Sequence, residues 1–309
     1  MTDQQPRPPR PKRRDVNGWL VLDKGVGMTS THAVAAVKRA LNAKKAGHAG
    51  TLDPLASGIL PIALGEATKT VPYVMDGRKA YVFTVAWGVE TETDDAEGRP
   101  VAASNTVPDP AAVQAALPAF TGEIDQVPPR YSAIKIAGER AYDLARDGEV
   151  VELQPRRVVV ERLALVHHDG DRSVFEAECG KGTYVRSLAR DIGRVLGCLG
   201  HVSALRRTRV GPFTEADAVT VAGLEEARDQ PLQNLPGLRP VETALCDLPQ
   251  VAVSREAASR LLRGQPVILR GRDAPPQGRI YATMNGALIA VGDVERGELV
   301  PHRVFNLGG

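Results

Sequence analysis

The chain has 309 residues, of which 25% are charged and 43% are hydrophobic, a composition typical of a soluble globular protein. Its net charge of +2 excludes a strongly basic or strongly acidic protein. Residues 1–60 nevertheless carry ten Lys/Arg and four Asp/Glu, a balance of +6, and the remainder carries 29 basic and 33 acidic residues, a balance of −4. Positive charge is therefore concentrated in the first 60 residues.

The cysteines and the apolar runs exclude further classes of protein. Cys179, Cys198 and Cys246 are widely spaced and form no CxxC pair, so neither a zinc site nor a disulfide framework is expected. No apolar run approaches the roughly 20 residues that span a bilayer, and the N-terminus lacks the apolar segment of a signal peptide. We expect a cytoplasmic protein with reduced thiols and no membrane segment.

The N-terminal part begins with a tail and continues into regular structure. Residues 1–16 are rich in proline and arginine and cannot bury enough apolar area to order themselves, so we expect a disordered basic tail. This tail either aids solubility or makes non-specific phosphate contacts. Residues 18–23 predict a short buried strand. Thr29 or Ser30 then caps a helix with apolar residues at helical spacing: Val34, Val37 and Leu41.

The middle of the chain predicts strands separated by loops. Residues 79–88 alternate in polarity, which places Tyr81, Phe83, Val85 and Trp87 on one face of a strand. The acidic and polar stretch 90–108 predicts an exposed loop, and a helix follows near 111–117. Val127-Pro128-Pro129 interrupts regular structure. Further strands are predicted over 132–137, 157–167 and 173–179.

The last third completes an α+β pattern. A helix with an apolar stripe of Val185, Leu188, Ile192 and Val195 precedes a basic strand over 206–213. Prolines cluster between 228 and 250 and mark a boundary. The last 60 residues predict one short helix and several strands. We therefore predict an α+β fold with a mixed, largely antiparallel sheet over 17–235 and a small β-rich domain over 245–309.

Residues 48–61 are the most informative segment, reading His-Ala-Gly-Thr-Leu-Asp-Pro-Leu-Ala-Ser-Gly-Ile-Leu-Pro. Asp53 lies in a short polar turn between Lys44-Lys45 and the apolar stretch 59–64. A lone carboxylate on such a turn is a candidate nucleophile, and the basic flank suggests a polyanionic substrate. Taken alone, Asp53 would more often be a turn residue that bonds its own backbone before a proline, but the surrounding motif favours chemistry.

Two other side chains allow both a structural and a functional interpretation. Three roles are open for His48: a general base, a ring that stacks on unpaired bases, or a surface residue. A metal ligand is not expected, because no second ligand stands at metal-binding spacing from His48. Tyr81 belongs to the core by default, and its alternative role is an aromatic platform for a flipped base.

A glycine-rich segment, Gly180-Lys181-Gly182, precedes the helix that carries Tyr184, Arg186, Arg190 and Arg194. The three arginines recur every four residues. They form either a solvated face, on which Asp191 pairs with Arg194, or a row whose self-repulsion a phosphate partner would relieve. Arg186 could also bind a carboxylate bidentately, lower its pKa and keep it ionised.

The basic strand carries Leu205, Arg206, Arg207 and Arg209. Alternation places Leu205, Arg207 and Arg209 on one face. This face is either the apolar floor of a pocket rimmed by phosphate contacts, or an edge whose charges prevent aggregation.

Together these segments resemble the TruB family of tRNA pseudouridine synthases over most of the chain. The matching stretches are 19–30, which contains Lys24, and 48–61, 79–81, 127–146, 181–186 and 205–207. Gly25 stands where the family usually has proline, which is expected to loosen the turn after Lys24 without removing function. From about residue 250 the chain is similar, with lower specificity, to the small PUA-type RNA-binding domain of this family.

The resemblance implies that residues 17–235 are a catalytic domain that isomerises the T-loop uridine at tRNA position 55 to pseudouridine after base flipping, without a cofactor or a metal. Asp53 would be the essential carboxylate, paired with Arg186 and supported by Lys24. The RNA would be contacted by four further side chains: Tyr81 stacking on the flipped uracil, Tyr184 and Leu205 lining its pocket, and His48 entering the T loop.

The resemblance also bears on partners and leaves alternatives. The T arm of tRNA would be the partner of a monomeric enzyme without an obligatory protein partner, because residues 94–132 look more like the stand-alone bacterial enzymes than like dyskerin-type enzymes, which need guide RNA and partner proteins. An RNA-folding or RNA-binding module is a second class. A glycosidase is a third, but that chemistry usually needs two acidic groups and the motif of Asp53 holds one.

Overall fold

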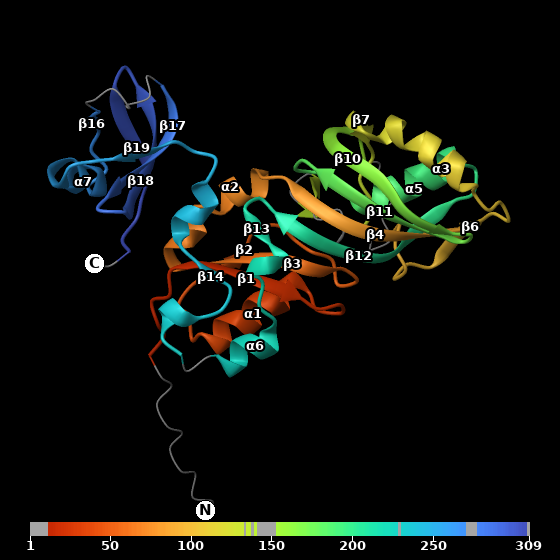
Figure 1. Ribbon diagram of the computed structural model, residues 1–309, viewed down its shortest axis with the longest axis horizontal. Helices are drawn as coiled ribbons and strands as arrows, with labels where there is room; N and C mark the ends of the chain where they lie inside the picture. The colour runs from red at the N-terminus through yellow and green to blue at the C-terminus, as the bar shows by residue number, and fades with distance from the viewer. Residues whose placement is uncertain are drawn as a thin grey trace, which may run out of the picture.

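Two β-sheets organise the part of the chain that the computed structural model describes, which is residues 12–132, 134–136, 139–140, 153–227, 230–269 and 277–307 (Figure 1). The larger sheet has ten strands. Eight follow one another in the order β14 (Leu238–Arg239), β1 (Gly18–Lys24), β3 (Ser57–Leu64), β12 (Gly200–Val210), β4 (Lys79–Trp87), β11 (Arg172–Cys179), β10 (Arg156–Asp169) and β7 (Gly122–Gln126). The other two are β2 (Ala46–His48), beside β3, and β13 (Phe213–Thr214), beside β12.

Within this sheet β3 and β12 run parallel, and every other pairing of its named strands is antiparallel. The predicted mixed, largely antiparallel sheet is therefore confirmed. The parallel pair depends on Gly58, whose φ is +101° and whose added Cβ would lie 2.2 Å from the carbonyl oxygen of Arg207. Only glycine fits this close approach, which brings β12 against the loop that carries Asp53.

Helices cover the large sheet at both of its ends. Their bounds are α1 (Ser30–Ala40), α2 (Val71–Asp76), α3 (Pro110–Ala116), α5 (Val185–Val195) and α6 (Val221–Glu226). Short 3-10 helices are η1 (Gly65–Lys69), η2 (Leu117–Phe120), η3 (Glu215–Asp217), η4 (Leu232–Asn234) and η5 (Val241–Leu245). Figure 1 shows α1 and α6 together below β1 and β3, with α3 and α5 at the far end of the sheet. None of the helices in the described ranges is long and apolar enough to cross a membrane.

The local sequence explains where these elements form. The Thr29 side chain accepts a hydrogen bond from the His32 N–H and caps α1, as predicted. Strand β1 is apolar on both faces because Leu20 and Leu22 pack toward α1, whereas Trp19 and Val21 join a second core on the opposite face.

The second sheet lies next to α2 in Figure 1 and confirms the predicted β-rich C-terminal domain. Its order is β15 (Gln250–Ala252), β17 (Gly278–Met284), β18 (Ala287–Glu295), β19 (Glu298–Val304) and β16 (Val267–Ile268), with helix α7 (Arg255–Leu262) against it. Leu288, Val291 and Phe305 share a core with Trp19 of β1, so the two sheets pack together. The predicted domain limits of 17–235 and 245–309 stay a prediction.

The structure corrects several predicted elements. The stretch 90–108 is not simply an exposed loop, because it contains the paired strands β5 (Val89–Thr91) and β6 (Pro100–Ala103) and buries Glu90, Asp94 and Asp95. These carboxylates can be buried because arginines of α5 pair with them. Val195, placed on the apolar stripe of that helix, is 66% exposed because α5 ends there.

Other differences concern boundaries. The basic strand begins at Gly200 and not at 206, and β7 had no predicted counterpart. Strand β8 (Lys135–Ile136) lies within the predicted strand 132–137. It pairs with β9 (Glu139–Arg140), which was not predicted. Residues 1–11 of the predicted tail and residues 133, 137–138 and 141–146 of the 127–146 motif lie outside the described residues.

Candidate active site

Asp53 lies on the loop between β2 and β3, and its side chain is 35% exposed. The first residue of α1 holds this loop: the Ser30 hydroxyl accepts a hydrogen bond from the Leu52 N–H at 2.9 Å and donates one to the Leu52 carbonyl oxygen at 3.0 Å. Within the loop, the Ala56 N–H donates to the Asp53 carbonyl oxygen. The backbone is thus fixed on both sides of a carboxylate that solvent can reach.

Arg207 of β12 braces the same loop from the opposite side. Its guanidinium donates to the carbonyl oxygens of Ile59 (2.8 Å), Thr51 (3.1 Å) and Gly50 (3.3 Å), and the residue is only 2% exposed. The expectation that Arg207 and Arg209 share one face of the strand is wrong, and so is the alternative of an edge strand, because β12 lies between β3 and β4. A register shift in β12 separates the two residues; Arg207 points into the protein and Arg209 pairs with Glu178.

Arg186 of α5 faces the Asp53 carboxylate. The distance from its Nη2 to Asp53 Oδ2 is 3.0 Å, and its Nη1 lies 3.6 Å from Asp95 Oδ2. The same nitrogens donate to the carbonyl oxygens of Thr93 (2.9 Å) and Tyr131 (3.0 Å). Because the Arg186 side chain is only 7% exposed, its charge is directed at two carboxylates through a region with little water.

The remaining arginines of α5 are also paired, which corrects both interpretations of this row. Arg190 binds Asp94 (2.9 Å) and Asp191 (2.8 Å), so Asp191 pairs with Arg190 and not with Arg194. Arg194 binds Glu90 at 2.5 Å. The arginines of α5 are therefore paired with carboxylates of the 90–95 segment, and not with solvent or a phosphate partner.

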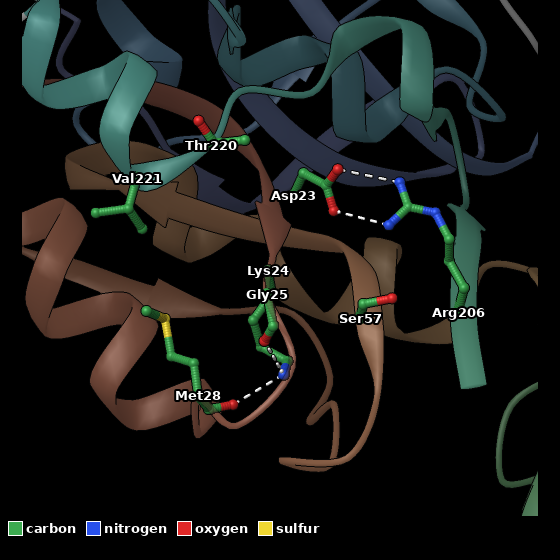
Figure 2. A pocket seen from close by; sticks show the side chains of 8 residues that line it. All are labelled: Asp23, Lys24, Gly25, Met28, Ser57, Arg206, Thr220 and Val221. Carbon is green, nitrogen blue, oxygen red and sulfur yellow. Dashed lines mark hydrogen bonds and ion pairs between the residues drawn. The ribbon is translucent and has the colours of Figure 1, made fainter. Parts of the chain in front are cut away.

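Lys24 closes the turn that follows β1. Its buried Nζ donates to the carbonyl oxygens of Gly25 (2.9 Å) and Met28 (2.8 Å), which Figure 2 shows as the amine turning back to its own loop. Burial lowers the pKa of Lys24, and the nearby charge of Asp53 raises it. The Gly27 N–H donates to the Pro54 carbonyl oxygen at 2.7 Å, so this turn is attached to the residue after Asp53.

A pocket of about 390 Å³ opens beside this turn (Figure 2). Asp53 is not among the residues that line it: Asp23, Lys24, Gly25, Met28, Ser57, Arg206, Thr220 and Val221. Its charged groups are largely paired, since Arg206 binds Asp23 with both terminal nitrogens and Glu215 with its Nε. This pocket therefore borders the Lys24 turn and does not contain the candidate nucleophile.

Two further predicted site residues, Tyr81 and Leu205, lie on neighbouring strands of the large sheet. Tyr81 is the partly exposed end of the row formed by Phe83, Val85 and Trp87 on β4, and it stands opposite Arg207 in the sheet. Burial raises the pKa of Tyr81, and both Arg207 and Asp53 lie within electrostatic range of its phenol. Leu205 is buried in the same core.

Tyr184 and His48 come from different elements, α5 and β2. Tyr184 is the residue at which α5 begins; burial raises the pKa of its phenol, on which Arg186 and Asp53 also act. His48 lies on β2 opposite Ile62 and is partly buried. Burial lowers the pKa of His48, which favours a neutral ring at neutral pH.

Two contributors, Asp95 and Gln126, were not predicted for this site, and Arg207 was predicted only for the face of the basic strand. All three side chains are buried. Asp95 contacts Arg186, Arg207 binds the Asp53 loop, and Gln126 binds the backbone of Tyr184. One sequence signal pointed to the pairing of carboxylates with arginines. It is the acidic run before residue 98 together with three arginines at helical spacing.

Family models match most of the chain. Residues 38–185 match the TruB family pseudouridylate synthase (N terminal domain). Residues 186–246 match the tRNA pseudouridylate synthase B C-terminal domain, and residues 249–305 match Pseudouridine synthase II TruB, C-terminal.

Full-length relatives and solved structures are similar as well. The tRNA pseudouridine synthase B of Rhodopseudomonas palustris is 63% identical over 97% of this chain and 84% of its own length. That of Rhizobium meliloti is 58% identical over 97% of this chain and 98% of its own. The crystal structure of the archaeal box H/ACA sRNP Nop10-Cbf5 complex contains a chain with a TM-score of 0.70 and 26% identity, covering 94% of this chain and 85% of that one. The chain therefore belongs to the TruB family of pseudouridylate synthases, isomerases that act on tRNA.

Proposed function

We propose that this enzyme isomerises uridine 55 in the T loop of tRNA to pseudouridine after flipping the base, with Asp53 as its essential carboxylate and without a cofactor. The bond between N1 and C1′ breaks, the uracil rotates, and C5 bonds to C1′. The C5 proton then leaves while N1 gains one, so the product is an isomer of the substrate. The observation that carries this proposal is a solvent-accessible Asp53 held 3.0 Å from a buried Arg186.

The pairing supports a nucleophilic role for Asp53. The Arg186 guanidinium lies 3.0 Å from Asp53 Oδ2, and this charge-assisted contact orients the carboxylate for attack. Because Arg186 also contacts Asp95 and two carbonyl oxygens, its position does not depend on Asp53 alone. The guanidinium is therefore in place before the substrate binds, which removes a reorganisation cost from the reaction.

The surrounding side chains supply what a flipped base needs. Extracting a base from its stack costs a few kcal/mol, which stacking and pocket contacts must recover. In this proposal Tyr81 stacks on the uracil, and Tyr184 and Leu205 line its pocket. In this proposal the His48 ring enters the T loop and fills the space that the flipped base leaves. A neutral, partly exposed ring is suited to this role. Lys24 supports the site by closing the turn after β1, which the Gly27 N–H attaches to the Pro54 carbonyl oxygen.

We further propose that the enzyme acts in the cytoplasm as a monomer, on the T arm of tRNA and without an obligatory protein partner. The support is that relatives named tRNA pseudouridine synthase B are similar over nearly the whole chain. The similar solved structures are Nop10-Cbf5 and Cbf5-Nop10-Gar1 complexes, but their matching chains are only 26% and 28% identical to this one.

The test is tritium release from a T-arm stem-loop whose only labelled residue is 5-³H-uridine at position 55. The wild-type enzyme should release tritium and Asp53→Asn should not, although both should bind the RNA. Asp109→Asn is the matched control, because Asp109 also precedes a proline but its side chain caps α3, accepting a hydrogen bond from the Ala111 N–H. Release by Asp53→Asn at the wild-type rate would contradict the role of Asp53. RNA binding without release by either protein would favour a binding module.

A further inference from the structure

Gln126, the last residue of β7, holds both backbone groups of Tyr184. Its Nε2 donates to the Tyr184 carbonyl oxygen at 3.1 Å, and its Oε1 accepts from the Tyr184 N–H at 2.8 Å. The residue is 2% exposed, so water cannot replace these contacts. An amide side chain is suited to this task because it carries a donor and an acceptor at the same end.

The chain around Tyr184 needs such an anchor. Tyr184 begins α5 with an extended backbone, and its own side chain makes no capping hydrogen bond. The residues before it form a turn in which Gly182 has a φ of +84°. The Val159 carbonyl oxygen of β10 holds this turn. It accepts hydrogen bonds from the Gly180 N–H and the Thr183 hydroxyl. Gln126 therefore supplies the side-chain contacts that fix the backbone of Tyr184 itself.

The position of Tyr184 matters because its phenol is close to the reacting groups. Tyr184 lies two residues before Arg186, whose Nη2 is 3.0 Å from Asp53 Oδ2, and both charges act on the electrostatics of the partly buried phenol. The phenol is connected to the backbone through two torsions, so a shift of the backbone at Tyr184 moves the ring with it.

We propose that Gln126 is a positioning residue for the isomerisation, which places the Tyr184 ring against the flipped uracil by fixing the Tyr184 backbone. This inference rests on the proposed function, because the reaction assigned to Asp53 gives Tyr184 its role. Gln126 itself does not touch the reacting atoms in this account.

The loop after Gln126 has its own attachments, which makes the role testable. The Val127 carbonyl oxygen accepts hydrogen bonds from the Ser187 hydroxyl (2.9 Å) and from Arg190 Nη2 (2.8 Å). Loss of the Gln126 amide therefore leaves this loop joined to α5. The substitution should disturb the start of the helix without detaching the loop.

Gln126→Met removes both hydrogen bonds while nearly conserving side-chain volume. We expect kcat for tritium release from the T-arm RNA to fall about 10-fold to 100-fold, because small misplacements of a substrate-contacting group cost rates of this order. The Kd for the RNA should stay within about 3-fold, since other contacts bind it. Gln126→Glu, which keeps an acceptor for the Tyr184 N–H, is a second variant with a smaller expected loss.

Gln250→Met is the matched control, because Gln250 also makes two side-chain hydrogen bonds, to Thr283 and Tyr281, but in the second sheet. Its kcat should equal that of wild type. The decisive comparison is a double-mutant cycle with Tyr184→Ala, in which Gln126→Met should lower kcat by less than about 2-fold once the ring is gone.

An equal loss in both backgrounds would overturn the inference, as would wild-type kcat in Gln126→Met. If wild-type enzyme releases no tritium from this RNA, the proposed function fails and this inference fails with it. If wild type is active and only the cycle is additive, the inference alone fails.

Discussion

Arg207 donates a hydrogen bond of 3.1 Å to the carbonyl oxygen of Thr51, two residues before Asp53. The same guanidinium binds the carbonyl oxygens on either side of this stretch, Gly50 and Ile59. A buried cation thus spans the loop that presents the candidate nucleophile. The rigidity of that loop is set by a neighbouring strand as well as by its own glycines and proline.

Replacing Arg207 should therefore affect activity and stability together. We expect Arg207→Met to lower kcat by about 10-fold or more, because the Asp53 loop loses its brace. The free energy of unfolding should fall by about 1–3 kcal/mol, as carbonyl oxygens lose their donors. Single-turnover tritium release and urea unfolding measure the two effects. The adjacent Arg206→Met, which removes partly exposed ion pairs, should cost less than about 1 kcal/mol and leave kcat near wild type.

Asp95 and Asp94 are neighbours with different partners, which allows a paired test. Asp95 faces Arg186 at 3.6 Å, whereas Asp94 binds Arg190 at 2.9 Å. Asp95→Asn should lower kcat by about 10-fold with RNA affinity nearly unchanged, because Arg186 loses the second carboxylate that orients it. Asp94→Asn should leave kcat within about 3-fold of wild type, since it acts on an arginine that does not reach Asp53. Equal losses in the two variants would show that the acidic segment acts only through stability.

Gly25, where proline was expected, stands in a turn that is already closed. Lys24 binds the carbonyl oxygens of Gly25 and Met28, and an added Cβ at Gly25 would meet nothing within 4 Å. We expect Gly25→Pro to raise the free energy of unfolding by about 0.4–1 kcal/mol by restricting the unfolded chain, with activity unchanged. Thermal unfolding and tritium release test this.

Gly27→Pro is the control for that substitution. Gly27 has a φ of +83° and its N–H donates to the Pro54 carbonyl oxygen, so proline fits neither its backbone conformation nor its hydrogen bond. Gly27→Pro should destabilise the protein and lower kcat. A stabilised Gly27→Pro variant would show that the turn is not held as described.

Asp94 should make stability depend on pH. Burial raises its pKa to about 6 from an ordinary value of 3.8, although Arg190 opposes the shift. Between these two values the folded protein keeps a proton that the unfolded chain has lost, so the free energy of unfolding falls as pH rises. The full loss is roughly 3 kcal/mol, reached above about pH 6.

Asp94→Asn removes this titration and provides the measurement. From pH 4 to pH 7, the free energy of unfolding of Asp94→Asn should shift upward relative to wild type by up to roughly 3 kcal/mol. Urea unfolding at intervals of pH gives the difference directly, because the other titrating groups are shared by both proteins. Parallel curves for the two proteins would contradict the raised pKa.

The sequence by itself determined the features that arise from local patterns. Thr29 caps α1 because its side chain reaches an N–H three residues away, and the alternation in β4 buries Phe83, Val85 and Trp87 on one face. Such features depend on neighbours in the chain, and for that reason spacing and residue type predict them. The motif around Asp53 likewise identified the family through a contiguous segment.

Only the tertiary structure decided which charges meet. Glu90, Asp94 and Asp95 looked like an exposed acidic loop, and the arginines of α5 looked like a basic face about 100 residues later. Each group is costly to bury alone, and burial becomes favourable only when the fold brings opposite charges together. The same reason explains Arg207 and Gln126, whose partners are backbone groups of distant loops, which have no signature in residue type or spacing.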